Sequence, residues 1–368
     1  MGGQLRHRRA ALLPNHGMIV MSEYQFVHFL AVDRPVTEKQ LEYMERQSSR
    51  AEITPWEFTN EYHWGDFRGN AVEMLQRGYD IHLHYANFGV RRLMIRLPGG
   101  LPCGAPTFKA FLPEYGVRWI ADKKGKGGIL DICPEADPDS YSYDDVDPDK
   151  WLPRIAPLRE ELIGGDLRAL YLAWLACSGD DEALEPPVPA GLNKRSPALE
   201  TMSAYYQISL DLLASAAEGS PPLPEQRNAN QILQEWIARR SPEDLRSLVQ
   251  RLLGTDSAAA RAEILAEIRD ESGAASWPLA ESTRTLADLH AAAEKVGSRR
   301  KAKEEEARQA ALRKRLQDIV AAPRKLIGKI QQLAEGRSVA NYEEAADLAE
   351  LREALGPDRG PAEAAKVA

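Results

Sequence analysis

The chain has 368 residues, of which 43% are hydrophobic and 28% are charged, and its formal net charge at pH 7 is −8. This composition is typical of a folded protein and excludes a largely disordered chain. The negative charge excludes a general polyanion binder, although a local basic segment is still compatible with nucleic acid. The three cysteines are widely spaced, which excludes a disulfide framework or a zinc ribbon and fits a reducing compartment.

Residues 1–20 carry neither helical nor strand periodicity. Their longest apolar run is too short for a secretory signal, and no run in the chain is long enough to span a membrane. We therefore expect residues 1–20 to be a disordered tail or a mis-assigned start. We also expect a cytoplasmic protein without a membrane partner.

Residues 21–135 are expected to form an α+β domain. The aromatic and β-branched run at 24–32 predicts a buried strand, and Thr37 with Gln40 predicts a capping box that starts a helix. Strands and short helices then alternate, with two adjacent hairpins, which indicates a mixed or antiparallel sheet with packed helices. The further strands are expected at 52–64, 79–87, 90–97, 117–121 and 129–133, with short helices near 70–75 and 106–115.

The remainder of the chain is expected to be all-α, without a strand. An acidic, proline-containing linker at 136–150 leads into a helical domain at 151–280, in which Ser241 is a strong N-cap. Next, we expect a long charged helix that projects into solvent, either continuous or broken at Gly297-Ser298. This helix is expected at 281–322. A helical hairpin at 323–356 and a frayed tail at 357–368 are expected to follow it.

Two phrases in the first domain are distinctive, Asn60-Glu-Tyr-His-Trp-Gly-Asp-Phe-Arg-Gly69 and Arg91-Arg-Leu-Met-Ile-Arg-Leu-Pro98. In these phrases the chain resembles a family of uncharacterised bacterial proteins, over roughly residues 23–355. The resemblance implies a shared architecture and no particular chemistry.

The same two phrases supply the main candidate for a ligand site. Arginine forks bind carboxylate or phosphate, and acidic and imidazole groups lie close by in the sequence. The alternative is an aromatic turn held by an internal Asp–Arg pair. The candidate ligand-binding residues are Glu61, His63, Asp66, Arg68, Arg91, Arg92 and Arg96.

A second hypothesis concerns metal. His82 and His84 lie two residues apart on an expected strand, which puts both imidazoles on one face, and His63 precedes them. Three histidines could bind zinc or iron. The alternative is that His82 and His84 mark the polar face of a half-exposed strand, and we favour it. No nucleotide-binding, hydrolase or metalloprotease motif is present, and we expect no cofactor.

The segment from Arg299 to Lys329 carries eleven basic and four acidic residues. It could bind nucleic acid or an acidic partner through Arg299, Arg300, Arg313, Lys314 and Arg315. The alternative, a solvated helix held by pairs such as Glu304–Arg308, is favoured because no aromatic residues are interleaved. The leading functional hypothesis is a non-catalytic scaffold that binds a protein partner through helical surfaces. A ligand-binding protein or enzyme is second, and a nucleic-acid binder is third.

Overall fold

The first strands form one antiparallel sheet in this computed structural model. It describes residues 23–63, 65–99, 105–123, 127–135, 148–223, 229–254, 257–272, 277–324, 326–327, 329 and 349–356. The chain divides into two compact units, with the boundary after His290. The predicted segments 1–20, 357–368 and most of the acidic linker lie outside the described residues.

The sheet has seven strands in the order β2-β3-β1-β4-β5-β7-β6, and every neighbouring pair is antiparallel. Gly89, with φ of +106°, makes the tight turn between β4 and β5 that a left-handed residue allows. This confirms the predicted α+β domain. The strands are β1 (Gln25–Leu30), β2 (Glu52–Ile53), β3 (Glu57–Tyr62), β4 (Ile81–Ala86), β5 (Arg91–Leu97), β6 (Val117–Ala121) and β7 (Gly128–Ile132).

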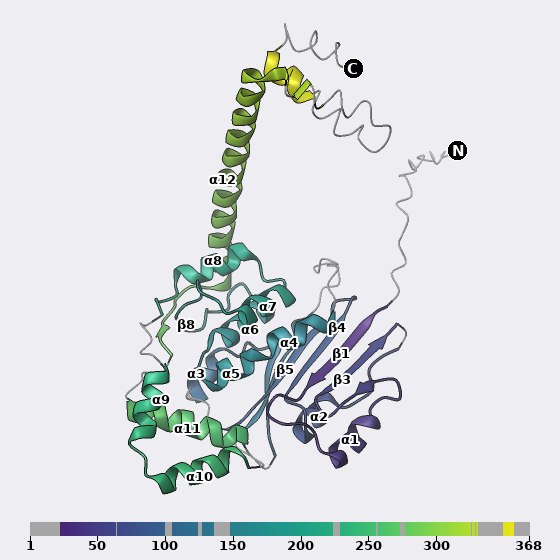
Figure 1. Ribbon diagram of the computed structural model, residues 1–368, viewed down its shortest axis with the longest axis vertical. Helices are drawn as coiled ribbons and strands as arrows, with labels where there is room; N and C mark the ends of the chain where they lie inside the picture. Colours follow the sequence, from purple (N-terminus) through teal and green to yellow (C-terminus); the bar gives the residue numbers. More distant parts are fainter. Residues whose placement is uncertain are drawn as a thin grey trace, which may run out of the picture. The chain divides into compact units, whose positions relative to one another are not determined.

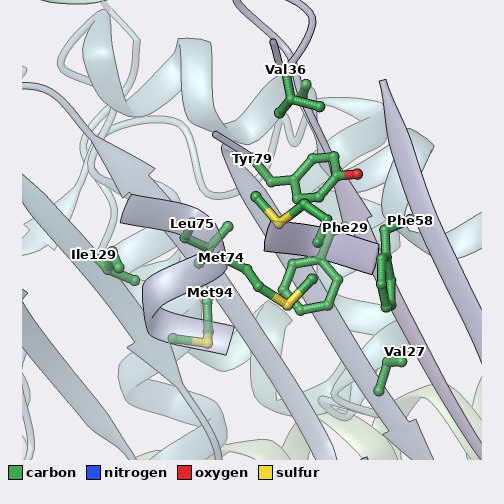
Figure 2. Close-up of a cluster of buried hydrophobic side chains, with 11 residues drawn as sticks. Val27, Phe29, Val36, Phe58, Met74, Leu75, Tyr79, Met94 and Ile129 are labelled. Atoms are coloured by element: carbon green, nitrogen blue, oxygen red, sulfur yellow. The ribbon is translucent and has the colours of Figure 1, made fainter. Parts of the chain in front are cut away.

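One face of the sheet, here called the α2 face, packs on α1 (Glu38–Glu45) and α2 (Ala71–Arg77). The predicted capping box starts α1, where the Gln40 Oε1 accepts from the Thr37 backbone N–H at 2.7 Å. Alternate residues of each strand point to this face and form its core. Figure 2 shows this core, which includes Val27, Phe29, Phe58, Met74, Leu75, Met94 and Ile129.

The opposite face, here called the α4 face, is covered by the helices that follow residue 150 (Figure 1). Arg159 joins them to the sheet. Its two Nη atoms donate to the two Asp33 carboxylate oxygens at 2.7 and 2.6 Å, and its Nε donates to the Arg96 carbonyl at 2.8 Å. The first unit is therefore layered, with the sheet between two sets of helices. The helices near this face are α3 (Ala105–Ala110), α4 (Trp151–Ile155), α5 (Pro157–Ile163), α6 (Arg168–Cys177) and α7 (Pro197–Tyr205).

The rest of the first unit is mainly helical. Ser241 caps α10 and shares a capping box with Asp244, as predicted. The helices are α8 (Leu210–Glu218), α9 (Ala229–Ala238), α10 (Pro242–Leu252) and α11 (Ser257–Ser272). One expectation is wrong, because β8 (Val188–Pro189) pairs with β9 (Leu279–Ala280) in a region predicted to lack strands. Such strands are too short to show a periodicity in the sequence.

The helix α12 (Leu286–Ala321) has 36 residues and runs through Gly297-Ser298 without a break. It begins in the first unit and ends in the second. In the second unit Ile319 and Leu351 pack together with Leu316, Leu326 and Ile327. The middle of the predicted hairpin at 323–356 lies outside the described residues. Among the described helices, none combines the length and the apolar composition that crossing a bilayer requires.

Candidate functional site

Five neighbouring strands each contribute one polar side chain to the α2 face, beyond the end of its apolar core. Strand alternation and register bring these side chains together although they are far apart in the sequence. We call this set the polar row, and it consists of Gln25 on β1, His84 on β4, Arg92 on β5, Asp131 on β7 and Arg118 on β6.

Asp131 holds the two arginines of the row. Its Oδ1 accepts from Arg92 Nε at 2.7 Å, and its Oδ2 accepts from Arg92 Nη2 at 2.8 Å and from Arg118 Nη2 at 2.7 Å. The Asp131 side chain is 0% exposed, whereas Arg92 is 26% and Arg118 is 67% exposed. Two guanidinium groups therefore share one buried carboxylate at the edge of solvent, which leaves one surplus positive charge.

The other half of the row is a chain of hydrogen bonds. Gln25 Nε2 donates to Asp66 Oδ1 at 2.7 Å, and Gln25 Oε1 lies 2.9 Å from His84 Nε2. Burial, and then the positive charge of Arg92, lower the pKa of His84 to about 4. His84 is therefore neutral at neutral pH.

The seven predicted ligand-binding residues are not brought together. Arg92 belongs to the polar row, and Asp66 accepts a hydrogen bond from Gln25 of the row. Arg96 lies on the same face further along β5, beyond Met94. Arg91 points to the α4 face, where its Nη1 donates to the Tyr205 carbonyl at 2.7 Å. Glu61 and His63 are exposed on the α4 side beside Tyr24, and Arg68 is also exposed. Asp66 accepts a hydrogen bond from Gln25 and pairs with no arginine among the described residues, so the predicted internal Asp–Arg pair does not form at Asp66.

The three candidate metal-binding histidines are also separated. His82 and His84 do share one face of β4, with ring centroids 6.4 Å apart. His82 is 1% exposed, stacks on Phe29 at 3.9 Å, and its Nδ1 lies 3.0 Å from the His28 carbonyl oxygen. His63 lies on the other side of the sheet. The prediction that His82 lies on a half-exposed strand face is wrong, because α2 and the loop that carries Phe67 cover β4. Within the described residues, no group of three His, Cys, Asp or Glu side chains could hold a metal ion.

Three members of the polar row were not identified from the sequence: Gln25, Arg118 and Asp131. A local signal exists for Asp131, a charged residue inside the apolar run Ile129-Leu-Asp-Ile132. A carboxylate in a fully buried strand needs a cationic or hydrogen-bonding partner, which points to a site. Gln25 and Arg118 carry no such signal.

A second feature is an exposed apolar strip on the helical side of the first unit. Here α9 and α11 pack through Trp236, Ile264 and Ile268, and Leu248 of α10 joins them. The next apolar residues of α10 and its C-cap face solvent at helical spacing: Val249 is 53%, Leu252 38% and Leu253 83% exposed. We call Val249, Leu252 and Leu253 the α10 strip. None of the residues of α10 is buried.

The predicted basic partner-binding residues lie on α12, and Arg299, Arg300, Arg313, Lys314 and Arg315 are all exposed. Glu304 pairs with Arg300 at 2.9 Å, and Arg308 lies 4.0 Å from Glu305. The helix therefore carries ion pairs three or four residues apart, as predicted, but Glu304 and Arg308 pair with other residues and not with each other. Arg315 also pairs with Glu350 at 2.7 Å.

No family model, curated protein or solved structure matches the chain. The resemblance to a bacterial family therefore stays a prediction.

Proposed function

We propose that this chain is a non-catalytic interaction protein that binds a helical segment of a partner protein through α10. The α10 strip is the observation that carries the proposal. The free energy falls when a partner covers exposed apolar side chains, by about 1.5–3 kcal/mol for each large aliphatic side chain that becomes fully buried.

The shape of the strip supports a helical partner. Val249, Leu252 and Leu253 are spaced i, i+3 and i+4, so they form one narrow row along the helix. A narrow row of this spacing is the pattern by which amphipathic helices bind one another. The capping box at Ser241 and the core at Trp236 hold α10 in helical form before a partner arrives, which lowers the entropic cost of binding.

Photo-crosslinking tests this proposal in cells that express the protein naturally. A photo-reactive residue at position 249 lies on the strip, whereas one at Ser247, also exposed, lies on the opposite side of α10. We expect crosslinks from position 249 to an amphipathic helical segment of one partner, and none from position 247. Equal yields from both positions, or crosslinks only to a second copy of the chain, would contradict the proposal.

A binding measurement with the purified full-length chain then completes the test. We expect Val249→Asp to weaken binding of the crosslinked segment by about tenfold or more, because it places a charge in an apolar contact. The matched variant Ser247→Asp adds the same charge to the same helix and is expected to bind as the unchanged protein does.

A further inference from the structure

The polar row offers hydrogen-bond donors that the structure does not use. Arg92 binds Asp131 through Nε and Nη2, which leaves Nη1, and Arg118 binds Asp131 through Nη2, which leaves Nε and Nη1. None of these three nitrogens has a hydrogen-bond partner among the described residues. Guanidinium groups fixed by a carboxylate in this way are preorganised for an anion, because their orientation is set before the anion binds.

The polar row also contains one hydrogen-bond acceptor, Nδ1 of His84, whose protonation state follows from its neighbours. Because Gln25 Nε2 donates to Asp66, the Gln25 oxygen must face His84, and His84 Nε2 must therefore carry the proton of that hydrogen bond. In the neutral imidazole the other nitrogen, Nδ1, then has a lone pair. Within the described residues Nδ1 has no partner. The pKa of His84, lowered to about 4 by burial and by Arg92, keeps the imidazole in this form at neutral pH.

An anion in contact with both halves of the row must meet two requirements. It needs negative oxygens for Arg92 and Arg118, and it needs an O–H group to donate to His84 Nδ1. A phosphate that retains one proton has both, whereas sulfate and carboxylates have no proton to donate at neutral pH. The exposed carboxylate of Asp66 lies at the His84 end of the row, where it favours the protonated side of such a ligand.

We infer that the polar row binds a phosphate group that carries at least one proton, either the free ion or a phosphomonoester. The anionic oxygens contact Arg92 and Arg118, and the P–OH group donates to His84 Nδ1. This site lies on the α2 face and does not depend on the partner proposed for α10.

Titration of the full-length protein with inorganic phosphate near pH 6, followed by calorimetry and by the His84 imidazole resonance, tests this inference. We expect saturable binding, and binding of sulfate at the same ionic strength to be at least about tenfold weaker, because sulfate cannot donate to Nδ1. A parallel titration with methyl phosphate separates the two sources: the form that binds more tightly identifies the ligand. Absence of phosphate binding, or equal binding of sulfate, would overturn the inference.

Arg118→Gln provides the mutational arm. Its side chain is largely exposed, so the variant is expected to fold and to keep the Arg92–Asp131 pair. Phosphate should bind it about tenfold more weakly or worse. Arg50→Gln removes the same charge from another exposed position and is expected to bind phosphate as the unchanged chain does. If both variants bind equally well, the phosphate does not occupy the polar row.

Discussion

At the residue scale, Asp131 organises one half of the polar row. Its carboxylate is withdrawn from water and accepts three hydrogen bonds from two arginines that reach it from strands on either side. Removing one partner from a buried ion pair costs far more than forming the pair gains, because the remaining charge is left desolvated. The aspartate is more buried than either arginine, so the row is most sensitive to the loss of Arg92, which would leave the buried carboxylate with only the exposed Arg118 as its partner.

We expect Arg92→Gln to lower the free energy of unfolding by about 3 kcal/mol, the lower part of the range for a broken buried ion pair, because it takes the main partner from the fully buried Asp131 carboxylate. Arg118→Gln should cost less than about 1 kcal/mol, because this side chain is largely exposed. Urea unfolding followed by circular dichroism measures both. Equal stability of Arg92→Gln and the unchanged protein would show that the buried Asp131 carboxylate does not need this partner.

The histidines of the sheet make stability depend on pH. Burial lowers the pKa of His84 to about 4 and also lowers the pKa values of His28 and His82. Unfolded histidine has a pKa near 6.5, so the unfolded chain binds more protons than the folded one between these values. The contribution of each neutral histidine is therefore fully present above about pH 6.5 and is lost as the pH falls.

His84→Gln isolates the contribution of His84 to the pH dependence of stability, because glutamine does not titrate. We expect the free energy of unfolding to fall less steeply in this variant than in the unchanged protein between pH 6.5 and 4. The difference is expected to reach at most about 3 kcal/mol. Denaturant unfolding across this pH range measures it. Parallel curves for the two proteins would mean that His84 titrates normally in the folded state.

At the element scale, α12 shows that a long helix can form with few tertiary contacts. Residues 299–315 are all exposed, yet the helix continues through Gly297, where glycine costs about 1 kcal/mol relative to alanine. Ion pairs three or four residues apart, such as Arg300–Glu304, offset part of this cost. These pairs also neutralise part of the positive charge that made nucleic acid a candidate partner.

We expect duplex DNA and RNA to bind no more tightly than about 10⁻⁵ M near physiological salt, which is ordinary non-specific affinity. Replacing Arg313, Lys314 and Arg315 with glutamine should flatten the salt dependence by about two phosphate contacts, because Arg315 is already paired with Glu350. Fluorescence anisotropy at several salt concentrations measures both. Submicromolar binding that the triple variant loses would favour nucleic acid over a protein partner.

At the scale of the whole molecule, the sheet depends on helices that follow it in the sequence. The α4 face carries buried residues such as Leu83 and Leu93, and Arg159 of α5 ties the helices to Asp33. A chain that ends before α4 would expose this face and leave Asp33 without its buried partner.

We therefore expect a fragment of residues 23–290 to unfold cooperatively in urea, and a fragment of residues 23–135 to be insoluble or to lack a cooperative transition. Circular dichroism and size-exclusion chromatography of the two fragments provide the measurement. A soluble 23–135 fragment with a sharp transition would show that the sheet is stable with only α1 and α2.

The sequence by itself determined the local elements and the class of fold. The aromatic run of β1, the capping boxes at Thr37 and Ser241 and the alternating hairpins depend on neighbouring residues, so their patterns are readable along the chain. Strand alternation also showed that His82 and His84 share a face.

Only the tertiary structure decided the polar row and the layered arrangement. Asp131 and Arg92 are 39 residues apart in the sequence, and His84 and Gln25 are 59 apart. Which strands become neighbours depends on the packing of the whole sheet rather than on local propensity. The direction of Arg91 has a local cause instead: it points away from the polar row because adjacent residues of a strand face opposite sides of the sheet, and Arg92 is its neighbour on β5.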